Sequence, residues 1–163
     1  MQKGDSIWRT FGRRADAVAF MKGSGVYPAI RGRALFYTTP AGVLVWVEVT
    51  GLPTATGLCD KPVFAFHIHD GTACEGNDID PFARAGSHFN PNGCPHPYHA
   101  GDLPPLFGAN GRGFSAFLTD RFSLSAVMGK PVVLHARPDD FTTQPAGNAG
   151  AKIACGIITP TAR

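Results

Sequence analysis

The sequence has few charged residues and no long hydrophobic run, and each of these absences argues against a class of protein. Charged residues make up 17% of the 163 residues and hydrophobic ones 44%, which argues against a disordered chain. No apolar segment approaches the ~20 residues needed to cross a bilayer, so we expect no membrane span. The net charge is only +3, and no basic stripe is interleaved with aromatic residues, so nucleic-acid binding has little support.

Two further sequence features are absent, a secretory signal at the N-terminus and a C-x-x-C pair among the cysteines. Residues 1–23 contain no continuous apolar core of a secretory signal. We therefore expect a cytoplasmic protein, or an extracytoplasmic one if a leader has been removed. No two cysteines form a C-x-x-C pair, which argues against a zinc ribbon and leaves disulfides, zinc ligation and free thiols open for Cys59, Cys74, Cys94 and Cys155.

The chain is rich in turn-forming residues and in short alternating runs. Its 20 glycines and 14 prolines favour turns over long helices, and its length suits one domain with a full core. Apolar or alternating runs predict strands at residues 15–23, 29–38, 43–49, 64–69, 113–120, 131–137 and 152–159. A long irregular loop is predicted from Asp70 to about Pro105, and a second from Pro138 to Gly150. Seven or eight short strands predict an all-β sandwich or barrel.

The six histidines gather around the first loop and the strands beside it. In "FHIH", His67 and His69 share the strand face opposite the phenylalanines, because side chains alternate along a strand. In "HPYHAGD", His96, His99 and Asp102 follow at three-residue steps. Taken alone, the first motif most often means two half-buried histidines, whereas the second is a stronger sign of metal ligands. Taken together, they predict a metal site that fixes the loop, since imidazole suits copper and zinc, and carboxylate also suits zinc.

In this order and spacing, the motifs resemble those of the copper/zinc superoxide dismutase family. The landmarks are "FHIH", "GSHFNP", "H..HAGDL", "VVLHARPDD" and "GNAGAKIACGII", and the match runs from about Ala15 to the C-terminus. The resemblance implies an eight-stranded Greek-key β-barrel, a flattened sandwich, whose two long loops form the metal site on its outer face. It also implies copper and zinc as cofactors and the superoxide anion as substrate.

By position, two overlapping sets of four side chains resemble the family's metal ligands. The copper set is His67, His69, His88 and His135, and the zinc set is His88, His96, His99 and Asp102. His88 thus resembles the bridging imidazolate, which can leave copper, take up a proton and deliver it. Asp139 resembles the family's aspartate that accepts hydrogen bonds from one copper and one zinc histidine.

The cysteines divide into one pair that the family has and one that it lacks. Cys74 and Cys155 resemble the disulfide that ties the first loop to the barrel, and the short spacing from His69 to Cys74 is similar to bacterial members. The alternative is two free core thiols. Cys59 and Cys94 have no family counterparts, so a second bridge between them stays open.

The resemblance implies a superoxide dismutase, with one departure at the catalytic site. The family usually carries an arginine three residues before the "CG" cysteine, where this chain has Lys152. An ammonium keeps the charge but cannot reproduce the planar fork of arginine, so we expect an active but slower enzyme. The alternatives are a non-catalytic copper/zinc-binding protein, such as a copper buffer or chaperone-like domain, and a structural module with a zinc-fixed loop.

Two features stay open at this stage. Residues 1–14 lie outside the resemblance as an N-terminal extension, either a disordered arm or a packed strand, ahead of the domain of residues 15–163. No residue pattern selects between a monomer and a homodimer.

Overall fold

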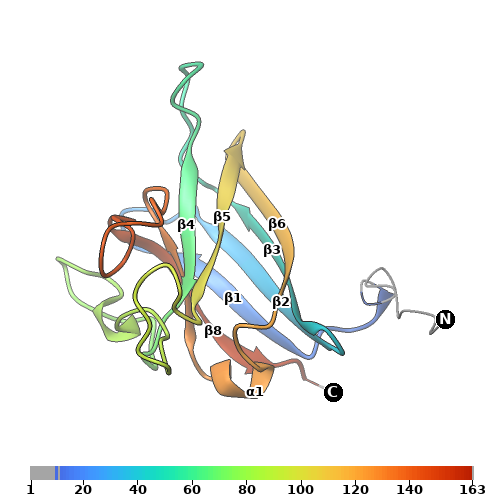
Figure 1. Cartoon of the computed structure of the whole chain (residues 1–163). Coiled ribbons are helices and arrows are strands. Elements are labelled where there is room, and N and C mark those ends of the chain that lie inside the picture. Colours follow the sequence, from blue (N-terminus) through green and yellow to red (C-terminus); the bar gives the residue numbers. More distant parts are fainter. Residues whose placement is uncertain (1–9, 11, 163) are drawn as a thin grey trace.

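Alternating apolar residues give the chain eight antiparallel strands that close into a barrel (Figure 1). The computed structural model describes residue 10 and residues 12–162. The strands are β1 (Ala17–Gly23), β2 (Arg31–Thr39), β3 (Gly42–Thr50), β4 (Val63–Ile68), β5 (Asp102–Ala109), β6 (Arg112–Thr119), β7 (Pro131–His135) and β8 (Lys152–Pro160). Two short helical segments are η2 (Ala83–Ala85) and α1 (Leu124–Val127), and no helix in the described residues is long and apolar enough to cross a membrane.

The strand order shows why distant parts of the chain meet. Around the barrel the order is β1-β2-β3-β6-β5-β4-β7-β8, so β3 lies beside β6 and β4 lies beside β7. Such non-consecutive neighbours are the mark of Greek-key connections. The predicted eight-stranded Greek-key barrel is therefore confirmed.

The core follows from the predicted alternation. Phe64, Phe66 and Ile68 of β4 point into the barrel, where they join the main hydrophobic cluster with the valines of β3. His67, between Phe66 and Ile68, belongs to the opposite face and is still fully buried. A side chain on the outer face can be that buried only if the loops cover it.

One predicted loop was too long. The irregular stretch was expected to reach about Pro105, but β5 already begins at Asp102. Pro104 and Pro105 have no backbone N–H to donate, and they lie where β5 makes few ladder contacts with β6, whose pairing is confined to Gly108 and Ala109. Prolines hid this strand because they usually indicate an interruption of a sheet.

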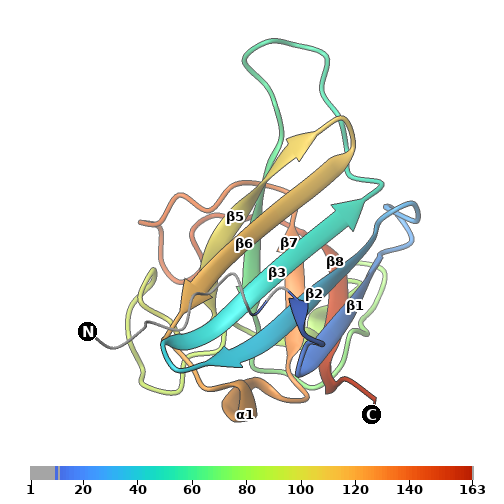
Figure 2. The same cartoon turned by 90° about the vertical axis from the view of Figure 1, so that its right-hand side faces the viewer.

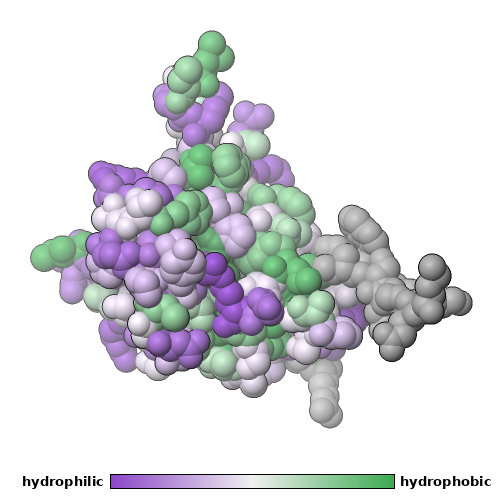
Figure 3. All heavy atoms as spheres, in the orientation of Figure 1, coloured by the Kyte–Doolittle hydropathy of each residue, from purple (hydrophilic) through white to green (hydrophobic). Residues whose placement is uncertain are grey.

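The two long loops gather on one side of the barrel, at the left of Figure 1. They join β4 to β5 and β7 to β8, while the β3–β4 connection projects upward, away from them, in Figures 1 and 2. Figure 3 shows mostly hydrophilic side chains over the loop side and more hydrophobic ones over β5 and β6, where Phe107 and Phe114 are exposed. The barrel is thus a scaffold that presents its loops at one place.

The proposed N-terminal extension, residues 1–14, lies largely outside the described residues. Of its described part, Arg13 donates hydrogen bonds to Asp16 at 2.9 Å and to the carbonyl of Thr38 at 2.7 Å. These contacts fasten the chain to the β1–β2 pair just before β1 begins.

Candidate metal centre

Two groups of four side chains converge beneath the loops. Within each group the candidate ligand atoms lie within 4.8 Å of one another, and every residue is buried. The first group is His67, His69, His88 and His135, and the second is His88, His96, His99 and Asp102. The structure therefore brings together every histidine that the sequence predicted, and His88 belongs to both groups.

Backbone pairing places these residues. His67 and His69 come from β4 and the position just after it, and His135 ends the neighbouring strand β7. The first loop folds back so that Phe89 donates a backbone hydrogen bond to the carbonyl of Ile68 at 2.8 Å. That pairing, together with a bridge between His69 and His88, brings His88 against the end of β4.

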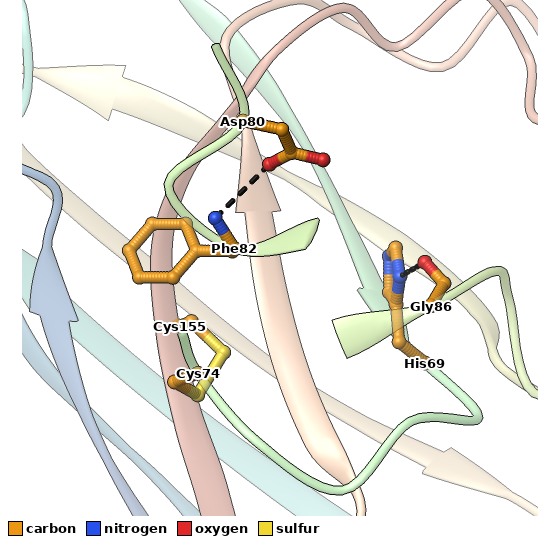
Figure 4. Close-up of a disulfide and its surroundings, with 6 residues drawn as sticks. All are labelled: His69, Cys74, Asp80, Phe82, Gly86 and Cys155. Atoms are coloured by element: carbon orange, nitrogen blue, oxygen red, sulfur yellow. Dashed lines mark hydrogen bonds between the residues drawn. A yellow bond between two sulfur atoms is a disulfide. The ribbon is translucent and has the colours of Figure 1, made fainter. Parts of the chain in front are cut away.

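Carbonyl groups of the two loops orient the rings of His69 and His135. His69 donates from Nδ1 to the carbonyl of Gly86 at 2.8 Å (Figure 4), and His135 donates from Nδ1 to that of Gly150 at 3.2 Å. Each ring is left with Nε2 for another partner, and these two nitrogens are 3.2 Å apart. Rings fixed in this way present their remaining nitrogens to a shared point.

Asp102 is the centre of the second group. Its Oδ1 is 2.7 Å from Nδ1 of His88, and its Oδ2 is 3.0 Å from Nδ1 of His96 and 3.3 Å from Nδ1 of His99. Three imidazole nitrogens and one carboxylate are a donor set suited to tetrahedral zinc.

Asp139 connects the two groups, as the resemblance implied. Its Oδ2 accepts a hydrogen bond from Nε2 of His67 and its Oδ1 one from Nε2 of His96, both at 2.8 Å. Burial alone would raise the pKa of Asp139, but hydrogen bonds from His67, the backbone N–H of Phe141 and His96 lower it to about 2. The carboxylate is therefore ionised and can hold two rings at once.

Several buried ring nitrogens have no hydrogen-bond partner among the described residues. The buried nitrogens without a hydrogen-bond partner are Nδ1 of His67, Nε2 of His88, Nδ1 of His96 and Nδ1 of His99. The last two lie near Asp102 but are not aligned for a hydrogen bond with it. A buried polar atom left unpaired costs about 1–3 kcal/mol, so this pattern fits side chains arranged for metal ions.

Burial also fixes the protonation state that a metal needs. It lowers the pKa of His135 to about 3, helped by the repulsion that His67 exerts when protonated, and it lowers the pKa of His69 well below its ordinary value. Burial also lowers the pKa of His67, although the hydrogen bond to Asp139 opposes this shift. At neutral pH these rings are uncharged and offer lone pairs.

The predicted disulfide is present and the second one is not. Cys74 and Cys155 are bonded, with 5.6 Å between their Cα atoms, and they tie the first loop to β8 (Figure 4). Cys59 and Cys94 are free thiols, so the bridge left open between them does not form. The reason is geometric, because Cys59 lies on the projecting β3–β4 connection and Cys94 lies in the loop before β5 (Figure 1).

A cavity of about 660 Å³ opens beside the first group. His69, His88 and His135 line it, together with Lys152 at the start of β8, next to His135 across the β7–β8 pair. The ammonium of Lys152 is paired with the carboxylate of Asp80. Sequence reasoning missed Asp80, because a contact between residues 72 positions apart leaves no local pattern.

Comparison with known proteins agrees with the geometry. A family model described as copper/zinc superoxide dismutase (SODC) matches residues 30–158. A Cu-Zn superoxide dismutase of Deinococcus radiodurans is 35% identical over 148 residues, which cover 79% of this chain and 77% of the relative. One of Legionella pneumophila is 32% identical over 88% of this chain and 86% of the relative. Superoxide dismutase 2 (Cu-Zn) of Aquifex aeolicus is 36% identical, with 78% of each chain covered.

Proposed function

Because the chain belongs to the copper/zinc superoxide dismutase family, we propose that it disproportionates superoxide to dioxygen and hydrogen peroxide. We assign copper to His67, His69, His88 and His135, and zinc to His88, His96, His99 and Asp102. The observation that carries this proposal is the position of His88, whose Nδ1 faces Asp102 while its Nε2 is buried and unpaired.

The residues around the two assigned ions have different roles in the proposed reaction. When bound, copper exchanges one electron with superoxide in each half-cycle, and zinc contributes charge without redox change. Asp139 holds His67 and His96 in their ligating orientations, so the two ion sites share one rigid support. Peroxide formation requires two protons, and Nε2 of His88 is the atom that we assign to deliver one of them.

Lys152 supplies the positive charge for docking the anion. Its side chain is only 16% exposed and lies on the wall of the cavity that His69 and His135 also line. A compact ammonium attracts superoxide but does not fix two oxygen atoms as a planar guanidinium does. We expect Lys152→Arg to raise kcat/KM, and an unchanged or lower value would contradict the proposed slowing effect of lysine.

A dismutase assay tests the main proposal. The protein loaded with copper and zinc should remove superoxide faster than the same concentration of free copper, and His88→Ala should lose most of this rate. Full metal content without dismutation would instead support a non-catalytic copper/zinc-binding protein. Unchanged copper content in His135→Ala would support a structural module, because our assignment makes that residue a copper ligand.

The disulfide also indicates the cellular compartment in which the protein works. We infer that the protein works in an oxidising compartment, since disulfides such as Cys74–Cys155 are rare where thiols are kept reduced. This inference favours the extracytoplasmic alternative. Fractionation of cells that express the protein, with thiol labelling of each fraction, tests it directly.

A further inference from the structure

Lys152 is the only lysine or arginine among the described residues that line the cavity beside the first group, and it is already paired with a carboxylate. Lys152 and Asp80 line the same cavity, and their charged groups are in contact. The side chain of Asp80 is 36% exposed, compared with 16% for Lys152, so Asp80 is on the solvent side of the pair. An anion that approaches Lys152 meets the carboxylate of Asp80 beside it.

Asp80 is held firmly in this position. Its Oδ1 accepts the backbone N–H of Phe82 at 3.0 Å (Figure 4), and its own N–H donates to the side chain of Asn77 at 3.0 Å. Its carbonyl accepts the N–H groups of Asn77 at 2.9 Å and Ala83 at 3.1 Å. The disulfide from Cys74 anchors the same loop. The carboxylate therefore cannot withdraw without disrupting this turn.

The charges on the wall do not favour an anion. The charged residues that line the cavity are Asp70, Asp80 and Lys152, so carboxylates outnumber cations there. Asp70 is engaged elsewhere, because its Oδ1 accepts the backbone N–H of Ser87 at 2.9 Å. Burial alone would raise the pKa of Asp80, but the hydrogen bonds from Lys152 and Phe82 lower it. Asp80 is the ionised group that directly opposes the attraction exerted by Lys152.

We propose that Asp80 is a positioning residue that limits anion binding, because its carboxylate competes with the incoming anion for the ammonium of Lys152. The proposal rests on the proposed dismutase function for its consequence in turnover, but its binding consequence is independent of turnover. Docking a small anion requires the ammonium to exchange one negative partner for another. Replacing the carboxylate with a neutral amide frees the cation and removes the competing charge.

Azide is a suitable probe, because it is a small anion whose binding to copper(II) can be followed by absorbance. In the copper- and zinc-loaded protein, we expect Asp80→Asn to bind azide at least threefold more tightly than the wild type at low ionic strength. The gain should shrink as salt is added, since salt screens charge interactions at a partly exposed site. Superoxide kcat/KM should rise in parallel.

Two variants act as matched controls. Asp78→Asn removes the same charge two positions away, from an exposed side chain that does not line the cavity, so its azide affinity should stay within about 1.5-fold of wild type. Asp80→Glu keeps the carboxylate and should return azide affinity to within twofold of wild type. Equal affinities for Asp80→Asn and Asp78→Asn would overturn the proposal.

The remaining outcomes also separate the hypotheses. Weaker azide binding in Asp80→Asn, with lower metal content, would mean that Asp80 only supports the loop, and the proposal would be wrong. A wild-type protein that binds azide but does not remove superoxide would refute the dismutase function alone. The comparison of azide affinities would still decide the role of Asp80.

Discussion

Gly147 lies directly against the carboxylate of Asp139, which leaves no room for a side chain at that position. A Cβ atom there would overlap Oδ1 of Asp139 and would come within 2.7 Å of Nε2 of His96. The second loop thus packs its backbone onto the residue that connects the two ligand groups. Its backbone also adopts a φ of 65°, which glycine tolerates far better than other residues.

Gly147→Ala should therefore displace Asp139 as well as strain the backbone. Gly93→Ala is the matched control, because Gly93 has a φ of 63° but a Cβ atom there would meet nothing within 4 Å. Both variants should lose about 1–2 kcal/mol of unfolding free energy to backbone strain. Only Gly147→Ala should also lose zinc affinity, by about 10–100-fold, measured by competition with a chelator. Equal zinc affinities in the two variants would show that the close packing is unimportant.

Asp139→Asn tests whether one carboxylate supports both ion sites. An asparagine has a single side-chain oxygen, so it cannot accept hydrogen bonds from His67 and His96 on two separate oxygens as Asp139 does. We expect zinc and copper affinities each to fall about 10–100-fold. Asp60→Asn, at an exposed position on the β3–β4 connection that projects away from the two loops, should leave both affinities unchanged. Loss of affinity for only one metal would contradict the shared support.

The Cys74–Cys155 bond should stabilise the protein as well as anchor the loop. It joins residues 81 positions apart, and loss of such a bond typically costs about 2–5 kcal/mol. Cys74→Ser should therefore lower the unfolding free energy of the metal-free protein by that amount, measured by denaturant titration. Cys59→Ser replaces an exposed free thiol and should change it by less than about 0.5 kcal/mol. Similar losses in both variants would argue against a stabilising bridge.

The alternating runs of the sequence predicted the barrel, and the resemblance to the copper/zinc superoxide dismutase family implied both ligand groups. The alternation around Phe64 and Phe66 placed His67 on the outer face, and the structure buries it under the loops. The separate motifs met at one place because Greek-key pairing brings β4 beside β7. The family motifs that contain these residues were needed to divide them into two groups.

Other features left no such trace. The strand β5 was hidden by Pro104 and Pro105, which interrupt any pattern based on alternation. The ion pair between Asp80 and Lys152 depends on how the first loop folds over β8, and no sequence motif links the two residues. The contact between Gly147 and Asp139 likewise arises only after the second loop has closed. Contacts between loops need coordinates, because spacing along the chain does not fix them.

The stability of the metal-free protein should fall as the pH falls below neutral. Burial, and then repulsion from His67 when it is protonated, lower the pKa of His135 from 6.5 to about 3 in the folded state. Between these two values the unfolded chain binds a proton that the folded chain does not, so acid favours unfolding. The pKa of Asp139 is also lower in the folded state, about 2 compared with 3.8, so a further loss follows between pH 3.8 and about 2.

Denaturant titrations of the metal-free protein at several pH values measure this proton uptake. Between about pH 6 and 4 the slope should correspond to roughly one proton for each histidine kept neutral by burial. His135→Gln removes one such group, so its slope should be smaller by about one proton than that of the wild type. An identical slope in the two proteins would mean that His135 is protonated in the folded state, which would contradict its burial as a neutral ring facing His69.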